Sequence, residues 1–118
     1  QETSAAIKRI YEQCGYIIDT HTAVAISVYN DYKKATGDET KTIIASTASP
    51  YKFTNDVLSS IGGKTDCDDF AQIDELSKMT DTAAPKQLLN LKNAEIRFKN
   101  AIDKDGMKNY VLQKFTSK

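Results

Sequence analysis

The apolar residues of this chain recur mainly at the three- and four-residue spacing of amphipathic helices. Near the amino terminus this spacing predicts a helix over residues 3–14, ended by Gly15, because glycine readily takes the left-handed conformation that closes a helix. A second helix is predicted from the capping residue Asp19 to about residue 36, where Gly37 ends it. Both helices precede the stretch that carries most of the candidate chemistry.

Further helices follow at the same spacing. Ser49 with Pro50 behind it has the form of a helix cap followed by the residue best tolerated at the first helical position, and the apolar residues after it predict a helix. The remaining helices are predicted over about 68–79, as one or two short turns over 85–91, and after the cap Asp103.

Two stretches predict β-strands instead. Residues 42–47 contain the apolar pair Ile43 and Ile44 after a turn, which is typical of a short buried strand. Over 94–99 apolar residues alternate with charged ones, the period of a strand with one solvated face. The order of elements therefore predicts a helix-rich α/β fold with short strands near 42–47 and 94–99.

Two strands alone do not form an independently stable sheet. Either they pair with each other, or their partners belong to sequence outside these 118 residues. The chain also opens at Gln1, without an initiator methionine and directly in helical sequence. We therefore expect a single domain, residues 1–118, that is a piece of a longer protein.

The charge and cysteine content narrow the classes of function. Sixteen basic and sixteen acidic residues leave no formal net charge, so the long-range field needed to bind nucleic acid or an anionic membrane is missing. The sequence also has no long apolar run and no signal-peptide pattern, and we expect neither partner. Cys14 and Cys67 lie far apart and outside any CxxC arrangement, which favours a reducing compartment, the cytoplasm.

Hydroxyl side chains stand where the first predicted strand ends and a helix begins: Ser46, Thr47 and Ser49. In α/β proteins such positions bind phosphates and cofactors, because the start of a helix presents free backbone N–H groups. Lys52, in the first turn of that helix, could meet a phosphate or carboxylate there. The alternative is that the hydroxyls only cap local backbone and that Lys52 is a solvated surface residue.

His21 is the single histidine of the chain. A metal site, or a Ser-His-Asp relay, would have to be built around that one ring, and we expect no metal site. His21 lies in the first turn of the helix that Asp19 caps, where backbone donors favour an anion or a neutral imidazole. It either meets a ligand there or is satisfied locally.

Two stretches together resemble the carboxy-terminal part of threonine synthase: "GYIIDTHTAVA" at 15–25 and "STASPYKF" at 46–53. In that family the first motif commonly has glycine, an aromatic residue, two apolar residues, Asp-Pro-His, a small residue and Ala-Val-Ala. The second commonly has Ser/Gly-Thr-Ala-His/Ser-Pro-x-Lys-Phe. The resemblance is good over roughly residues 5–63, and "DKDGMK" at 103–108 is similar to the family's end. The chain departs from the pattern at Thr20, usually proline, and at Ser49, often histidine.

The resemblance implies part of a pyridoxal-phosphate enzyme of the tryptophan-synthase-like fold, fold type II, which converts O-phosphohomoserine and water to threonine and phosphate. Thr47, and after it Ser46, would contact the pyridine nitrogen of the cofactor, while His21 and Lys52 would lie near the substrate or its phosphate. The family's Schiff-base lysine belongs to an earlier Ser-Phe-Lys-Asp-like stretch that these residues lack. No catalytic residue is therefore expected in this chain, which is predicted to be inactive without the amino-terminal remainder of the enzyme.

A function of a different class stays open beside this one. The chain could be a stand-alone helical binding or interaction module without catalysis, in which the strand-end hydroxyls are merely caps. A homodimer is compatible with either function, because an exposed strand edge can pair with a second copy.

Overall fold

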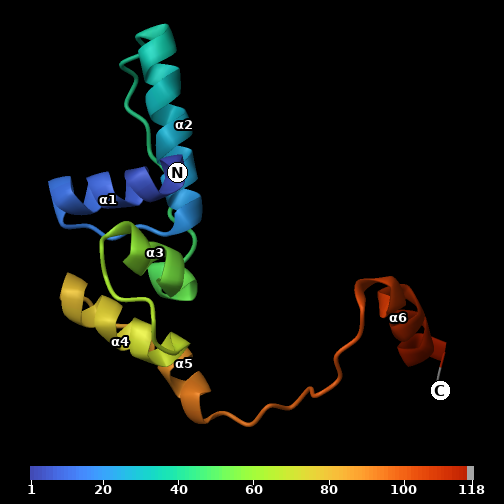
Figure 1. The fold of residues 1–118 in the computed structure, drawn as a ribbon. Helices are drawn as coiled ribbons and strands as arrows, with labels where there is room; N and C mark the ends of the chain where they lie inside the picture. The colour runs from blue at the N-terminus through green and yellow to red at the C-terminus, as the bar shows by residue number, and fades with distance from the viewer. Residues whose placement is uncertain (117–118) are drawn as a thin grey trace.

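The computed structural model of the chain describes residues 1–116 as a series of helices joined by loops (Figure 1). In chain order, with η for 3-10 helices, they are α1 (Glu2–Cys14), α2 (Thr20–Thr36), η1 (Pro50–Phe53), α3 (Thr54–Ser60), α4 (Asp69–Thr80), α5 (Lys86–Leu89), η2 (Asn90–Asn93), η3 (Lys104–Gly106) and α6 (Met107–Thr116). The helix-rich character predicted from the sequence is confirmed.

The helix ends follow the predicted signals closely. Gly15 and Gly37 both take left-handed conformations, with φ of 65° and 68°, and end α1 and α2. Their N–H groups donate to the carbonyls four residues earlier, which satisfies acceptors that a helix end otherwise leaves open. Ser49 also caps as predicted, since its hydroxyl accepts from the N–H of Tyr51 at 3.3 Å. The turn that it begins is η1, and the α-helical part starts only at Thr54.

The two predicted strands are wrong. Within residues 1–116 no residue belongs to a β-strand, and Ile43, which we expected to be buried, is 96% exposed. A strand exists only where a neighbouring strand takes its backbone hydrogen bonds, and neither 42–47 nor 94–99 has such a neighbour in the described chain. The described chain therefore consists of helices and loops, and 42–47 and 94–99 are loop segments where an α/β arrangement was predicted. The strand edge behind the expectation of a homodimer is missing as well, and that oligomeric state stays a prediction.

One hydrophobic core holds the first five helical elements together. Ile7 of α1, Leu58 of α3 and Leu76 of α4 are fully buried at its centre. In Figure 1, α1 crosses the base of α2, and α3 lies between α1 and α4. A hydrogen bond between distant segments also stabilises this core. The hydroxyl of Tyr51 in η1 donates to the carbonyl of Thr82, just beyond α4, at 3.0 Å. This core fixes the start of α2 against η1.

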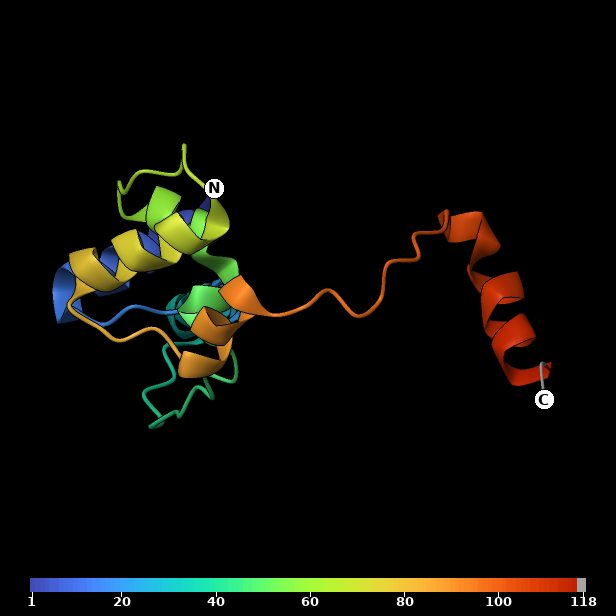
Figure 2. The same cartoon turned by 90° about the horizontal axis from the view of Figure 1, so that it is seen from below.

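The carboxy-terminal part leaves this core after η2. Figures 1 and 2 both show residues 94–103 as an extended trace that carries η3 and α6 away from the other helices. None of the described residues from 94 onward is buried. The radius of gyration is 19.1 Å, whereas a compact chain of this length would have about 13.5 Å. The molecule is thus a small helical core with an unpacked tail that exposes several apolar side chains.

Candidate functional site

The start of α2 is organised around the buried carboxylate of Asp19. This side chain is 0% exposed, and it caps the helix by accepting from the backbone N–H groups of His21 at 2.9 Å and Thr22 at 3.4 Å. These N–H groups have no partner within the helix itself. The cap predicted from the sequence is therefore confirmed, and it places an acidic group beneath the surface rather than on it.

The hydroxyl of Thr22 connects this cap to the second motif. It donates a short hydrogen bond to Oδ2 of Asp19, and its Oγ1 is also hydrogen-bonded to Oγ of Ser46 at 3.0 Å. Thr22 is buried, while Ser46 is exposed on the loop that follows α2. Asp19, Thr22 and Ser46 therefore form a hydrogen-bonded path from the interior to the surface, and this path joins residues that are 24 positions apart.

Two opposing influences set the charge of Asp19. Burial by itself would raise the pKa of this carboxyl, because it disfavours the ionised form. The hydrogen bonds from Thr22 and His21 stabilise the ionised form and together outweigh burial, so the pKa lies below its ordinary value. Asp19 is consequently a carboxylate at neutral pH, able only to accept hydrogen bonds.

His21 lies at the mouth of the same cluster, with its side chain 67% exposed. Its Nδ1 is 3.0 Å from Oδ1 of Asp19, and a carboxylate acceptor places the ring proton on Nδ1 in the neutral imidazole. Nε2 then carries the free lone pair. The ring also packs edge-on against Phe53, with centroids 4.9 Å apart. Asp19 and Phe53 thus fix the orientation of the imidazole from two sides.

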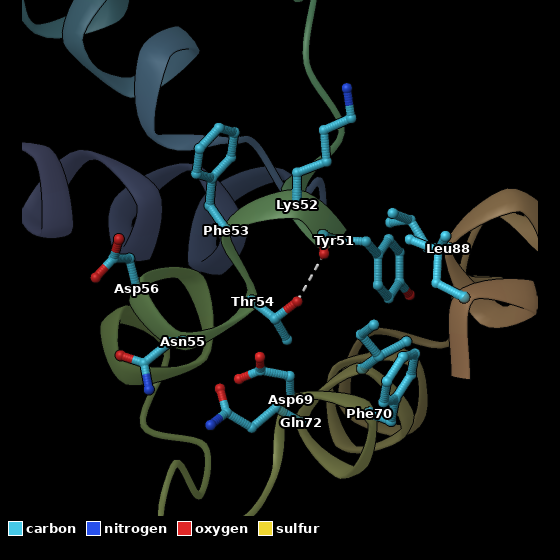
Figure 3. Close-up of a pocket in the computed structure, with 12 residues that line it drawn as sticks. Tyr51, Lys52, Phe53, Thr54, Asn55, Asp56, Asp69, Phe70, Gln72 and Leu88 are labelled. Atoms are coloured by element: carbon cyan, nitrogen blue, oxygen red, sulfur yellow. Dashed lines mark hydrogen bonds between the residues drawn. The ribbon is translucent and has the colours of Figure 1, made fainter. Parts of the chain in front are cut away.

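The other two predicted site residues lie outside this hydrogen-bonded path. Thr47 follows Ser46 on the exposed loop, and Lys52 is exposed in η1, next to Phe53. In Figure 3 the side chain of Lys52 rises away from the neighbouring helices, toward solvent. The structure therefore links His21 and Ser46 through Asp19 and Thr22, and among the described residues the side chains of Thr47 and Lys52 form no hydrogen bond with this path.

Sequence reasoning assigned no functional role to Thr22, and it treated Asp19 only as a cap and Phe53 only as an apolar helix residue. A signal for Thr22 was present, because it occupies the third helical position after the cap, from which a side chain can reach back to the cap. The bond to Ser46 and the contact between His21 and Phe53 had no such signal, since they depend on how α2 packs against the following loop and against η1.

The described residues 1–116 contain no group of three or more His, Cys, Asp or Glu side chains arranged to hold a metal ion. None of the described helices is both long enough and apolar enough to cross a membrane.

Comparison with protein families gives one result that bears on this cluster. Residues 22–111 match the family model described as "Threonine synthase, C-terminal". The matched range contains Thr22, Ser46, Thr47 and Lys52, and it begins one residue after His21. No match was found among curated proteins.

Proposed function

The chain belongs to the family of threonine synthase C-terminal domains, and from this premise we propose that it forms one wall of the cofactor site in a threonine synthase. The enzyme would convert O-phosphohomoserine and water to threonine and phosphate in the cytoplasm. The observation that carries this proposal is the path of hydrogen bonds from Asp19 through Thr22 to Ser46, because it holds the two sequence motifs in one place.

The exposed hydroxyls at 46 and 47 fit a pyridine ring nitrogen. Such a nitrogen accepts a hydrogen bond from a neutral hydroxyl without being forced into its protonated form. The carboxylate of Asp19, which would favour protonation, is buried and already engaged by Thr22 and His21. When bound, pyridoxal phosphate supplies the electron sink of the reaction. The part of this chain is to bind and orient the ring.

We assign the direct contact to Thr47 and a positioning role to Ser46. The hydroxyl of Ser46 is already hydrogen-bonded to Thr22 and so restrains the backbone at this point of the loop. Thr47 is the next residue, is exposed, and has no hydrogen bond from its side chain within the described part of the chain. Its hydroxyl can therefore turn to a ligand.

His21 and Lys52 would meet the substrate or its phosphate. The imidazole is held by Asp19 and Phe53 in one orientation with Nε2 left over, so it can donate to a phosphate oxygen when protonated or accept a proton when neutral. The ammonium of Lys52 adds a positive charge on the exposed side of η1. Both side chains are available to an anion that approaches from solvent.

The amino-terminal remainder of the enzyme is the proposed partner of the exposed apolar surface. Val24, Val28 and Tyr32 form a stripe along α2 at four-residue spacing, each at least 48% exposed. The extended segment and α6 add further exposed apolar side chains: Ile96, Phe98, Val111 and Phe115. Exposed apolar surfaces of this kind mark contact sites in other proteins. We therefore propose that these side chains pack against the amino-terminal remainder of the enzyme.

The test is cofactor titration of the full-length enzyme, followed by pyridoxal phosphate absorbance. Thr47→Ala is expected to weaken binding about tenfold, the effect of one lost hydrogen bond to a ligand, whereas Thr47→Ser retains it. Ser46→Ala and Thr22→Val each remove the hydrogen bond that restrains the loop next to Thr47. Both are expected to weaken cofactor binding less than Thr47→Ala does. Lys52→Met, which keeps the length of the side chain, is expected to raise KM for O-phosphohomoserine more than it lowers kcat.

Normal cofactor affinity and turnover in Thr47→Ala would contradict the assignment of Thr47. Titration of the 118-residue chain alone tests whether the cofactor site is shared with the amino-terminal remainder of the enzyme. This chain alone is expected to show no saturable binding of pyridoxal phosphate, and borohydride reduction is expected to label none of its lysines. A saturable, reducible complex would instead mean that this chain holds a complete cofactor site.

A further inference from the structure

The two side chains proposed to meet the substrate, His21 and Lys52, differ in their electrostatic surroundings. Nδ1 of His21 lies 3.0 Å from the carboxylate of Asp19, which is fully buried. Lys52 forms no ion pair within the described chain. In a protonated His21 the positive charge would therefore be balanced by Asp19, whereas the ammonium of Lys52 keeps its full charge. A phosphate group gains more from Lys52, and this leaves His21 for another role.

The carboxylate of Asp19 determines which nitrogen of His21 carries the proton. An ionised carboxylate can only accept, so the neutral imidazole carries its proton on Nδ1, facing Oδ1. The hydroxyl of Thr20 is also near Nδ1, but its 3.5 Å distance is long for a hydrogen bond. Thr22 engages the other carboxylate oxygen, Oδ2, so Asp19 is held in place beside the ring. Nε2 is then the nitrogen with the lone pair.

The imidazole of His21 is held in one orientation and borders open space. Its side chain is 67% exposed, and it lines an open hollow of about 380 Å³ between the starts of α1 and α2. Phe53 packs edge-on against the ring, with centroids 4.9 Å apart, which limits its rotation. Nε2 has no hydrogen-bond partner in the described chain. A ring that a carboxylate orients through one nitrogen, with the other nitrogen free, is suited to accept a proton.

We propose that His21 is a catalytic residue whose Nε2 takes a proton from the water molecule that is added to the substrate. Asp19 and Phe53 are positioning residues, and Lys52 is the residue of this chain that binds the phosphate. The inference rests on the proposed function, because it requires that O-phosphohomoserine reaches this face of the chain. It differs from the sequence-based prediction, which placed no catalytic residue in the chain and gave His21 a binding role.

The proton has a defined origin and destination. Conversion of O-phosphohomoserine to threonine adds a hydroxyl to the middle carbon and moves one hydrogen from that carbon to the terminal carbon. It also breaks the terminal C–O bond, whose electron pair stays on the phosphate. The oxygen of water bonds to the middle carbon while one of its O–H bonds breaks, and that proton goes to the lone pair of Nε2. The imidazolium, stabilised by Asp19, then gives the proton to the phosphate, and His21 becomes neutral again.

Nitrogen-15 NMR of the imidazole tests the geometry in the 118-residue chain, without cofactor or turnover. His21 is the single histidine, so its ring signals are identified directly. The neutral ring is expected to carry its proton on Nδ1. Asp19→Ser, which keeps a helix cap but withdraws the acceptor from the ring, is expected to move the proton to Nε2. Asp31→Asn is the matched control, because this aspartate of α2 is 76% exposed and paired with Lys34.

A neutral ring that carries its proton mainly on Nε2 in the unaltered chain would overturn the proposal, whatever the activity of the enzyme. Equal spectra for the unaltered chain and Asp19→Ser would do the same, since Asp19 would then have no influence on the ring.

Kinetics of the full-length enzyme separate proton transfer from substrate binding. His21→Gln is expected to lower kcat about 100-fold or more with little change in KM, because glutamine can donate a hydrogen bond but cannot take up a proton. Lys52→Met is expected to show the opposite pattern, with the larger effect on KM. A raised KM with an unchanged kcat in His21→Gln would make His21 a ligand of the substrate and would overturn the proposal.

Chemical rescue separates proton transfer from a structural role. His21→Ala leaves a gap beside Phe53, and added imidazoles are expected to restore part of kcat, the more basic ones restoring more. Equal rescue by imidazoles of different basicity would contradict proton transfer, and so would the absence of rescue.

Titration of the same variants with pyridoxal phosphate keeps this inference distinct from the proposed function. His21→Gln is expected to bind the cofactor normally, since the ring contact is assigned to Thr47. Normal kcat together with normal cofactor binding in His21→Gln would overturn only the role of His21. Normal cofactor binding in Thr47→Ala would instead contradict the proposed cofactor contact and leave the NMR result for His21 unaffected.

Discussion

At the scale of single residues, Asp19 couples the stability of a helix to the geometry of the proposed site. Its carboxylate accepts backbone N–H groups at the start of α2, a role that is needed in any helix. The same two oxygens hold Nδ1 of His21 and the hydroxyl of Thr22, and through Thr22 they reach Ser46. A change at Asp19 should therefore affect folding and the orientation of the site residues together.

The free energy of unfolding of the chain at acidic pH should depend on whether the Asp19 carboxylate is ionised. The pKa of Asp19 is lower in the folded chain than in the unfolded one, so the unfolded state takes up a proton first as the pH falls. Its contribution is therefore fully present above about pH 4, where an unfolded aspartate is ionised, and is lost as the pH falls through the folded pKa. Asp19→Asn should lower stability at neutral pH and flatten the decline that sets in as the pH falls to the ordinary aspartate pKa of about 4 and below it.

Urea unfolding followed by circular dichroism across that pH range is the measurement. Asp74→Asn serves as the matched control for the removal of one carboxylate, because its side chain is exposed on α4. A decline in acid that is the same for Asp19→Asn as for the unaltered chain would show that Asp19 is not the group responsible.

At the scale of elements, the turn after α3 depends on the absence of a side chain. Gly63 follows that helix, and its N–H donates to the carbonyl of Leu58 at 2.9 Å. A Cβ atom placed on Gly63 would collide with the side chain of Leu58 and would lie 2.8 Å from the sulfur of Met79. Leu58 is fully buried at the centre of the core, so its side chain has little room to move. A side chain at position 63 could therefore be accommodated only by disturbing the packing of α3 on α4.

Gly63→Ala should consequently destabilise the chain by overpacking, by about 1–3 kcal/mol in the free energy of unfolding. Gly106→Ala is the control, since a Cβ there meets nothing within 4 Å, and it should be neutral or slightly stabilising. Denaturant unfolding of both variants measures the difference. Equal free energies of unfolding for the two variants would mean that Leu58 and Met79 yield at no cost.

At the scale of the whole molecule, the structure separates into a packed part and an unpacked part. Residues 1–93 contain every buried side chain of the described chain. The segment after them is extended and then helical, and exposes Ile96 by 72% and Phe115 by 80%. A tail that packs on none of the core helices contributes little to the stability of the core, and its exposed apolar side chains are available to the proposed partner.

Deleting the residues after Asn93 should therefore change the free energy of unfolding of the core by less than about 0.5 kcal/mol. Deleting the chain after Asp81 instead removes Leu88, which packs on the core, and the Thr82 oxygens that bond to Tyr51, and should cost about 2 kcal/mol or more. Thermal and denaturant unfolding of the two truncations give the comparison. A large loss on the first deletion would show that the tail folds back onto the core.

The sequence by itself determined most of the helices and the ends of α1 and α2, because these signals are local, whereas the predicted cap Asp103 makes no side-chain cap bond and α6 begins only at Met107. A left-handed glycine at 15 or 37, a cap at Asp19 or Ser49, and apolar residues at helical spacing act within one or two turns, and all of them appear where predicted. The motifs also sufficed to identify the family, since a resemblance in sequence requires no coordinates.

Only the tertiary structure decided which of these residues meet. Whether 42–47 and 94–99 are strands depends on neighbours to which their backbone could bond, and the described chain offers none. The bond between Thr22 of α2 and Ser46 of the following loop, and the contact between His21 and Phe53, likewise arise from the packing of separate segments. Local propensity is carried by adjacent residues, whereas contacts across the fold depend on the balance of burial and hydrogen bonding over the whole chain.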